Sequence, residues 1–213
     1  MGSSAVTEQL REDIISGALL PGERLVELQL ADRYSAGRAT IRAALVELRS
    51  EGLVQIEANR GATVRRVPLE EAVEIVEARG VLEALLAGKA AINGAAEERD
   101  RLGVIVGDMA AAVAAEDAPR YSELNLEFHR LVHRMGRHHV AAELVGVLRN
   151  RAVHHQYRLA GMPGRSAVSL PQHRDIAEAI RAGDEDAARK AMAAHLASVA
   201  AVLRQWVEAG PRA

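Results

Sequence analysis

The sequence predicts a mainly α-helical protein with an N-terminal winged helix-turn-helix domain and a C-terminal, all-α antiparallel helical bundle. Hydrophobic residues make up 49% of the 213 residues and aromatic residues only 2%, with alanine and leucine dominant, a composition that favours helices. Strand-like periodicity occurs shortly before Pro68, and no convincing strand follows it. We therefore expect two domains, residues 5–67 and 69–209.

The first three elements are expected to be helices. Residues 5–16 carry apolar side chains at intervals of four, which gives a helix one apolar face. A turn containing Pro21-Gly22 separates it from a short helix within 26–35, and a third helix follows over 38–50. The apolar positions that define the first and third helices are Val6, Leu10, Ile14, Ile41, Leu45 and Leu48.

The periodicity changes after the third helix. Residues 53–56 and 62–64 are short strand candidates on either side of Asn59-Arg60-Gly61, which is a hairpin signal. Three helices followed by a two-stranded ribbon are the pattern of a winged helix-turn-helix domain.

Beyond Pro68 the sequence predicts about six helical segments, each bounded by glycine, proline or aspartate signals. Such a series of helices predicts an antiparallel bundle. The segments are 69–91, 97–115, 118–136, 138–161, 169–182 and 184–209.

Composition excludes several classes of protein. The chain has no cysteine, which rules out disulfides, thiolate metal sites and thiol nucleophiles. It has no signal-peptide pattern at its start and no apolar run of the roughly 18 residues that a membrane span needs. We therefore expect a soluble, cytoplasmic protein without a membrane partner. The net charge of −2 means that a DNA partner would require locally clustered basic residues.

Such a cluster occurs at the start of the third helix. Arg38 and Arg42 stand where unpaired N–H groups already carry partial positive charge, so an anion is expected opposite them. In a helix-turn-helix, the second helix of the pair places this end in the major groove, where arginine suits guanine edges. Arg33 and Arg49 could reach the flanking DNA backbone, and Arg60 lies at the ribbon tip. The alternative is that these arginines are simply solvated.

Three histidines are expected to point into the bundle. His129, His173 and His195 lie on the apolar faces of three different helices, and Asn125 precedes His129 by one turn. Neutral imidazoles that converge in this way can bind Zn, Ni, Fe or Cu. The alternative is three hydrogen-bonded core histidines. The other histidines are expected at exposed or helix-boundary positions without a role: His133, His138, His139, His154 and His155.

The stretch "LLPGERLVELQLADRYSAGRATIRAALVELRSEGLVQIEANRGATV" resembles the N-terminal domain of GntR-family bacterial transcription regulators. The resemblance covers about residues 6 to 67. It implies DNA contacts by Arg38, Thr40 and Arg42, with Arg60 and Gly61 in the wing. One position departs from the family pattern, because Gly37 replaces the usual Ser or Thr cap, at a cost of about a few tenths of a kcal/mol.

The segments "RGVLEALLAGKAA", "NLEFH" and "HRDIAEAIRAGDEDAARKAMAAHL" resemble the FCD-type ligand-binding domain of the FadR-like branch of that family. The resemblance implies a divalent metal on Asn125, His129, His173 and His195, with a small carboxylate effector completing the site. The family's Asp is Asn125 here, a neutral and weaker ligand, so a metal-free effector site is an alternative. We expect Arg79 to hold the effector carboxylate; the alternative is a surface Arg79–Glu83 pair.

Together these features predict a ligand-responsive transcription regulator that binds operator DNA as a homodimer. The rival is a metal-dependent hydrolase-like helical domain fused to a DNA-binding module, since an open metal site can activate water. The sequence has no HExxH motif, and "HRLVH" lacks the glutamate that would act as base, so we expect no enzyme. A DNA-packaging protein fits poorly with the near-neutral charge.

Overall fold

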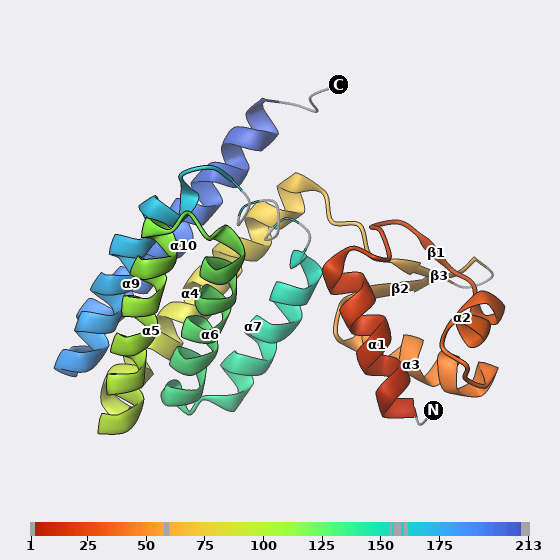
Figure 1. Cartoon of the computed structure of the whole chain (residues 1–213), viewed down its shortest axis with the longest axis horizontal. Coiled ribbons are helices and arrows are strands. Elements are labelled where there is room, and N and C mark those ends of the chain that lie inside the picture. Colours follow the sequence, from red (N-terminus) through yellow and green to blue (C-terminus); the bar gives the residue numbers. More distant parts are fainter. Residues whose placement is uncertain (1–2, 58–59, 154, 156–158, 160–161, 210–213) are drawn as a thin grey trace. The chain divides into compact units, whose positions relative to one another are not determined.

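The computed structural model describes residues 3–57, 60–153, 155, 159 and 162–209. The chain divides into two compact units, one made of Met1–Pro68 with Gly146–His154 and the other of Leu69–Val145 with His155–Ala213. The mainly α-helical class is confirmed, with a winged helix-turn-helix in the first unit and a helical bundle in the second (Figure 1).

Three helices and a small sheet form the N-terminal segment of the first unit. The helices are α1 (Ser3–Ser16), α2 (Glu27–Arg33) and α3 (Arg38–Ser50). Their inward faces supply a common core because the apolar residues recur at helical spacing, as the sequence predicts. The core side chains with no exposed surface include Val6, Leu10, Ile14, Ile41 and Leu48.

The sheet has three antiparallel strands, β1 (Arg24–Leu25), β2 (Val54–Glu57) and β3 (Gly61–Val64), in the order β1-β3-β2. Val54 pairs with Val64 and Arg24 pairs with Thr63. The expected two-stranded ribbon is therefore present, but β1 adds a third strand. Two residues are too few to show alternation, so the sequence pattern could not reveal β1. The expected turn residue Asn59 lies outside the described residues.

The second unit is a bundle of long helices (Figure 1). Helix α4 packs against α10 and α6, and α9 packs against α10 and α5. The helix bounds are α4 Leu69–Asn93, α5 Ala96–Ala114, α6 Ala118–Gly136, α7 His139–Arg151, α9 Arg165–Ala182 and α10 Glu185–Glu208. The part of α7 that starts at Gly146 belongs to the first unit.

Two helix bounds differ from the sequence prediction by more than two residues. The segment predicted over 138–161 is not one helix, because α7 ends at Arg151. Helix α9 begins at Arg165, four residues earlier than predicted, directly after Gly164, whose φ of 76° is left-handed. Pro171 lies inside α9 rather than near its start. This earlier start places Arg165 on the same helix as His173.

Aspartate caps hold the starts of α6 and α10, which together carry three of the four predicted metal ligands. The Arg120 N–H donates to Asp117 Oδ1 at 3.0 Å, and the Ala187 N–H donates to Asp184 Oδ1 at 2.9 Å. Caps of this kind satisfy otherwise unpaired N–H groups and stabilise a helix by about 1 kcal/mol. Within the described part of the chain, no helix is both long and apolar enough to cross a bilayer.

Candidate functional site

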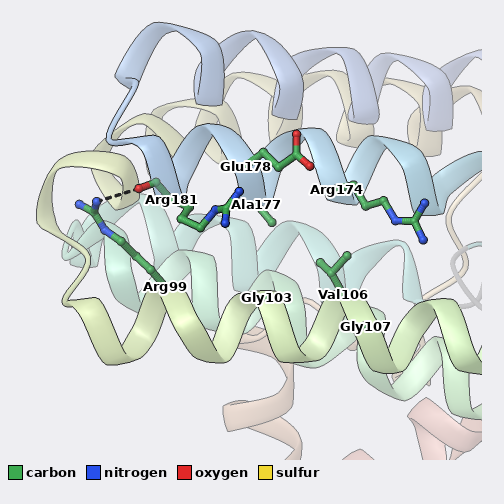
Figure 2. Close-up of a pocket in the computed structure, with 8 residues that line it drawn as sticks. All are labelled: Arg99, Gly103, Val106, Gly107, Arg174, Ala177, Glu178 and Arg181. Carbon is green, nitrogen blue, oxygen red and sulfur yellow. Dashed lines mark hydrogen bonds between the residues drawn. The ribbon is translucent and has the colours of Figure 1, made fainter.

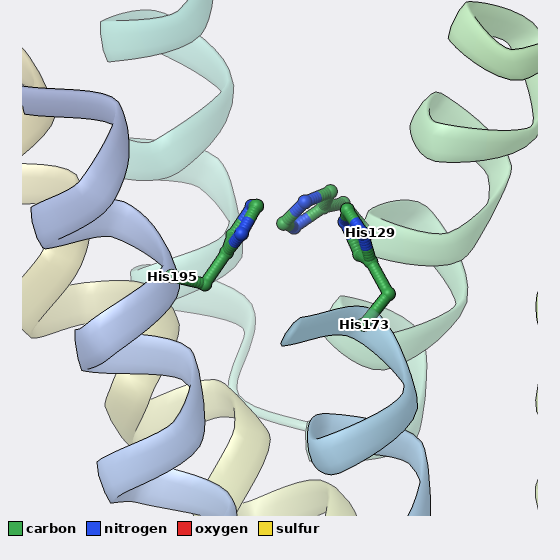
Figure 3. A group of neighbouring side chains, drawn as sticks. All are labelled: His129, His173 and His195. Atoms are coloured by element: carbon green, nitrogen blue, oxygen red, sulfur yellow. The ribbon is translucent and has the colours of Figure 1, made fainter. Parts of the chain in front are cut away.

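Three imidazoles meet inside the helical unit. His129 from α6, His173 from α9 and His195 from α10 each offer a ring nitrogen, and these nitrogens all lie within 4.8 Å of one another. The ring centroids are 4.5 Å apart for His173 and His195, and 5.4 to 5.5 Å apart for the other two pairs. The rings point toward a common point (Figure 3). All three side chains are buried, with at most 4% of each residue exposed.

Each imidazole has an oxygen close to its Nδ1. His173 Nδ1 donates to the Ser169 carbonyl oxygen at 2.8 Å, and His195 Nδ1 donates to Gln172 Oε1 at 2.9 Å. His129 Nδ1 lies 2.8 Å from Glu83 Oε2. A proton held on Nδ1 leaves the Nε2 lone pair as the available ligand, which is the arrangement that metal-binding histidines use.

His173 provides the strongest sign that the cluster fits a cation. Its Nε2 is buried and has no hydrogen-bond partner among the described residues. A buried polar atom without a partner is costly unless something else satisfies it. A divalent metal such as Zn or Ni, bound by three Nε2 atoms, would satisfy this nitrogen.

Burial keeps two of these imidazoles, His173 and His195, neutral. Burial, with a smaller contribution from the neighbouring His129, lowers the pKa of His173 to about 3. Burial also lowers the pKa of His195 well below its ordinary value, with smaller contributions from His173 and His129. Neutral imidazole is the form that binds a metal, so the ligands need not lose a proton first.

Asn125 lies one turn before His129 on α6 and is half-buried. The role of Asn125 as the fourth ligand remains a prediction. Its amide oxygen would contribute no charge, so a metal on this site would keep its full positive charge. Such a site attracts an anion to the remaining coordination position.

Glu83 belongs to the candidate site, although the sequence analysis considered it only as a surface partner of Arg79. Its side chain is fully buried on α4, and Oε2 lies 2.8 Å from His129 Nδ1 and 3.2 Å from His133 Nε2. Arg79 donates to Glu83 Oε1 through Nε at 2.8 Å and through Nη2 at 2.6 Å. Burial alone would raise the pKa of Glu83, but Arg79 and the two imidazoles lower it well below its ordinary value.

These contacts correct two expectations. Arg79 and Glu83 are paired, but the pair is buried rather than on the surface. His133, to which the sequence assigned no role, is mostly buried and contacts Glu83. The missed signal was a charged residue on the apolar face of α4, one turn after Arg79. The expected contact of Arg79 with an effector carboxylate stays a prediction, since its guanidinium already faces an internal one.

The Glu83 network carries a stability prediction. We expect Glu83→Ala to lower the free energy of unfolding by about 3–5 kcal/mol, because it leaves the buried Arg79 guanidinium without its carboxylate. Chemical denaturation of metal-free protein, followed by circular dichroism, measures this change. Glu74→Ala, an exposed position on the same helix, should stay within about 0.5 kcal/mol of the wild type. Equal effects of the two substitutions would contradict the role of Glu83.

The predicted DNA-reading end of α3 is exposed. Helix α3 begins at Arg38 with Gly37 as its N-cap, and no side chain caps it. The Arg38 and Arg42 side chains are 61% and 60% exposed. Arg42 Nε lies 2.8 Å from the Glu27 carboxylate, and Arg38 Nη2 lies 3.4 Å from it. Both guanidinium groups therefore contact a protein carboxylate, but they remain at the surface.

The other predicted DNA contacts have different surroundings. Arg33 is 2.6 Å from Asp13 Oδ2, which also accepts from the Tyr34 hydroxyl at 2.6 Å. Arg60 is highly exposed near the wing and lies 3.3 Å from Glu57. Thr40 is half-buried, whereas Arg49 and Gly61 are exposed. All of these residues belong to the first unit, and Gly61 begins β3 with a left-handed φ of 86°.

A separate open pocket of about 330 Å³ lies between α5 and α9 (Figure 2). Its lining includes Arg99, Arg174 and Arg181 but none of the three clustered histidines. Arg99 donates to the carbonyl oxygens of Gly94, Ala91 and Arg181, so its guanidinium holds helix ends. The pocket and the histidine cluster are therefore different features of the same unit.

Comparison with known proteins assigns both parts of the chain. Residues 3–64 match the family described as bacterial regulatory proteins, gntR family, and residues 74–198 match the FCD domain. The HTH-type transcriptional repressor RspR of Escherichia coli is 26% identical over 196 residues, which cover 92% of this chain and 86% of RspR.

Two solved structures share the fold. The E. coli protein McbR/YncC superposes with a TM-score of 0.77 at 22% identity, covering 95% of this chain and 97% of that one. Lar, which controls the expression of the Listeria monocytogenes agr system, superposes with a TM-score of 0.62 at 20% identity. That match covers 96% of this chain and 97% of Lar.

Proposed function

Because this chain is a gntR-family transcription regulator with an FCD domain, we propose that it binds operator DNA as a homodimer and senses a metal-dependent carboxylate effector. Its relatives are regulators rather than enzymes, so the hydrolase alternative is not favoured. The observation that carries the proposal is the convergence of three buried imidazoles with their Nδ1 atoms turned to oxygen partners.

His129, His173 and His195 would hold the metal, with Asn125 as a neutral fourth ligand. A bound divalent metal supplies a Lewis-acid position that attracts a carboxylate. Glu83 fixes the orientation of His129, while Ser169 and Gln172 fix those of the other two imidazoles. Outer partners of this kind are each worth about 10- to 100-fold in metal affinity.

On DNA, Arg38 and Arg42 would release their contacts with Glu27 and contact base edges in the major groove instead, with Thr40 beside them. Exposure of both guanidinium groups supports this role. Arg33, Arg49, Arg60 and Gly61 would contact the flanking backbone or minor groove. In free protein, the Glu27 carboxylate holds Arg42 in place, and the hydrogen bond from Arg42 lowers the pKa of Glu27.

A homodimer would present two such domains to the half-sites of an inverted repeat. We propose that the second copy covers an apolar surface on α4 and α7, two helices that pack together through Leu86, Ala141 and Val145. Large apolar side chains are exposed on both helices, and a second copy would bury them. They are Val81, Ile92, Val140 and Leu144.

Leu144→Asp tests this surface. We expect it to convert a dimer at micromolar concentration into a monomer, because a charge would be buried without a partner. Light scattering coupled to size-exclusion chromatography measures the mass. Val104→Asp, an equally exposed apolar position on α5, serves as the control and should leave the mass unchanged. If Leu144→Asp stays dimeric, the second copy lies elsewhere.

Effector binding in the bundle would change how the two DNA-binding domains engage their half-sites. A coupling free energy of about 1–3 kcal/mol is enough to change operator affinity by roughly 5- to 150-fold. The experiment that tests the proposal is elemental analysis of purified protein together with a thermal-shift screen of small carboxylic acids. A bound divalent metal and a stabilising carboxylate support it, and the absence of both counts against it.

A further inference from the structure

Arg165, the first residue of α9, is a cation whose charge no carboxylate balances within the described part of the chain. Its Nη1 donates to Ser198 Oγ at 3.0 Å, while its Nη2 is buried and has no hydrogen-bond partner there. Burial lowers the pKa of Arg165, Tyr121 offsets that effect in part, and no carboxylate contributes. A buried donor left in this state calls for an anionic ligand.

Arg165 is also close to the imidazoles. Arg165, Ser169 and His173 follow one another at intervals of four along the same face of α9. Ser198, which holds the guanidinium, lies three residues after His195 on α10. Three residues correspond to a rise of about 4.5 Å, so Ser198, which the guanidinium contacts, lies roughly one helical turn from His195.

Three other arginines of the helical unit are less suited to binding an anionic ligand. Arg79 already faces Glu83, which compensates its charge. Arg99 is occupied by carbonyl oxygens, and Arg174 is exposed at the pocket of Figure 2, where solvent screens its charge.

We propose that Arg165 binds one carboxylate of a small dicarboxylate whose other carboxylate faces the Nε2 atoms of the histidine cluster. The inference rests on the proposed function, because the second carboxylate binds at the metal. The rise of about one helical turn between Ser198, which the guanidinium contacts, and His195 matches the span between the two carboxylates of a short aliphatic diacid. Arg165 thus selects for ligands with a second negative charge, and Arg79 keeps its structural pairing with Glu83.

Calorimetric titration of zinc-loaded protein with malonate, succinate and glutarate tests this inference, with acetate and succinamide as probes that lack one or both charges. At least one diacid should bind the wild type more tightly than acetate and succinamide do. Arg165→Gln should weaken the binding of that diacid by about 10- to 100-fold, the affinity that a charge-assisted hydrogen bond contributes. Arg174→Gln, on the same helix, should bind it like the wild type, and the zinc content of both variants should be unchanged.

Three results would overturn the inference: wild-type affinity in Arg165→Gln, a loss in Arg174→Gln instead, or no diacid binding to zinc-loaded wild type. Loss of zinc from Arg165→Gln would also count against it, because a residue that only binds the effector is not needed to retain the metal. If the wild type itself binds no zinc, the proposed function fails. The same titrations on zinc-free protein then decide separately whether Arg165 binds the diacid.

Discussion

The His173→Ala protein is expected to be isolated without its divalent metal, whereas the wild type retains about one equivalent per chain. His173 is fully buried, its Nδ1 is committed to the Ser169 carbonyl, and its Nε2 has no partner within the described residues. Removal of a direct ligand should lower metal affinity by more than the roughly 10- to 100-fold that follows removal of an outer partner. Elemental analysis after dialysis against a weak chelator measures the metal content.

His139→Ala is the matched control, since His139 is exposed at the start of α7 and belongs neither to the histidine cluster nor to the group of Glu83, His129 and His133. It should retain the metal. His129→Ala and His195→Ala should behave like His173→Ala, because each removes one of the three Nε2 atoms. Full metal content in all three variants would show that the imidazoles are hydrogen-bonded core residues, which is the alternative weighed from the sequence.

The second large effect is expected on DNA. Arg42→Ala should lose specific binding to an operator selected by the wild-type protein from random duplexes. A well-formed arginine contact with a base is worth about 1–3 kcal/mol, and a dimer loses two of them. Fluorescence anisotropy at a fixed salt concentration measures the dissociation constant, because phosphate contacts make every such value salt-dependent.

Arg130→Ala provides the control for this experiment, because Arg130 is an exposed arginine on α6 in the other unit. It should bind the selected operator like the wild type. If Arg42→Ala also binds with wild-type affinity, α3 does not read the DNA. In that case the Arg42–Glu27 contact would be only a surface ion pair.

The sequence predicted those parts of the fold that depend on local spacing. The bounds expected for α3 agree with the structure, since its apolar positions recur over three turns and glycines bracket it. The three buried histidines were found for the same reason: each lies among apolar residues at helical spacing, so burial of that face turns it inward.

Features that depend on contacts between distant segments could not be predicted in this way. Strand β1 exists because Arg24 and Leu25 pair with β3, not because of any local pattern. The contacts of Glu83 with His129 and His133 were not predicted because these histidines lie on another helix. Arg165 was overlooked because its isolation becomes visible only once α9 and α10 are packed together. The sequence identifies each charged residue, but which of them form pairs depends on how the folded chain packs.

The central claim is that occupancy of the histidine cluster controls the affinity of the protein for operator DNA. The most direct measurement is the dissociation constant for the selected operator with zinc-loaded protein, before and after addition of the diacid that binds most tightly. We predict a change of roughly 5- to 150-fold in the wild type and none in His173→Ala. An operator affinity in the wild type that is the same with and without zinc and diacid would contradict the account.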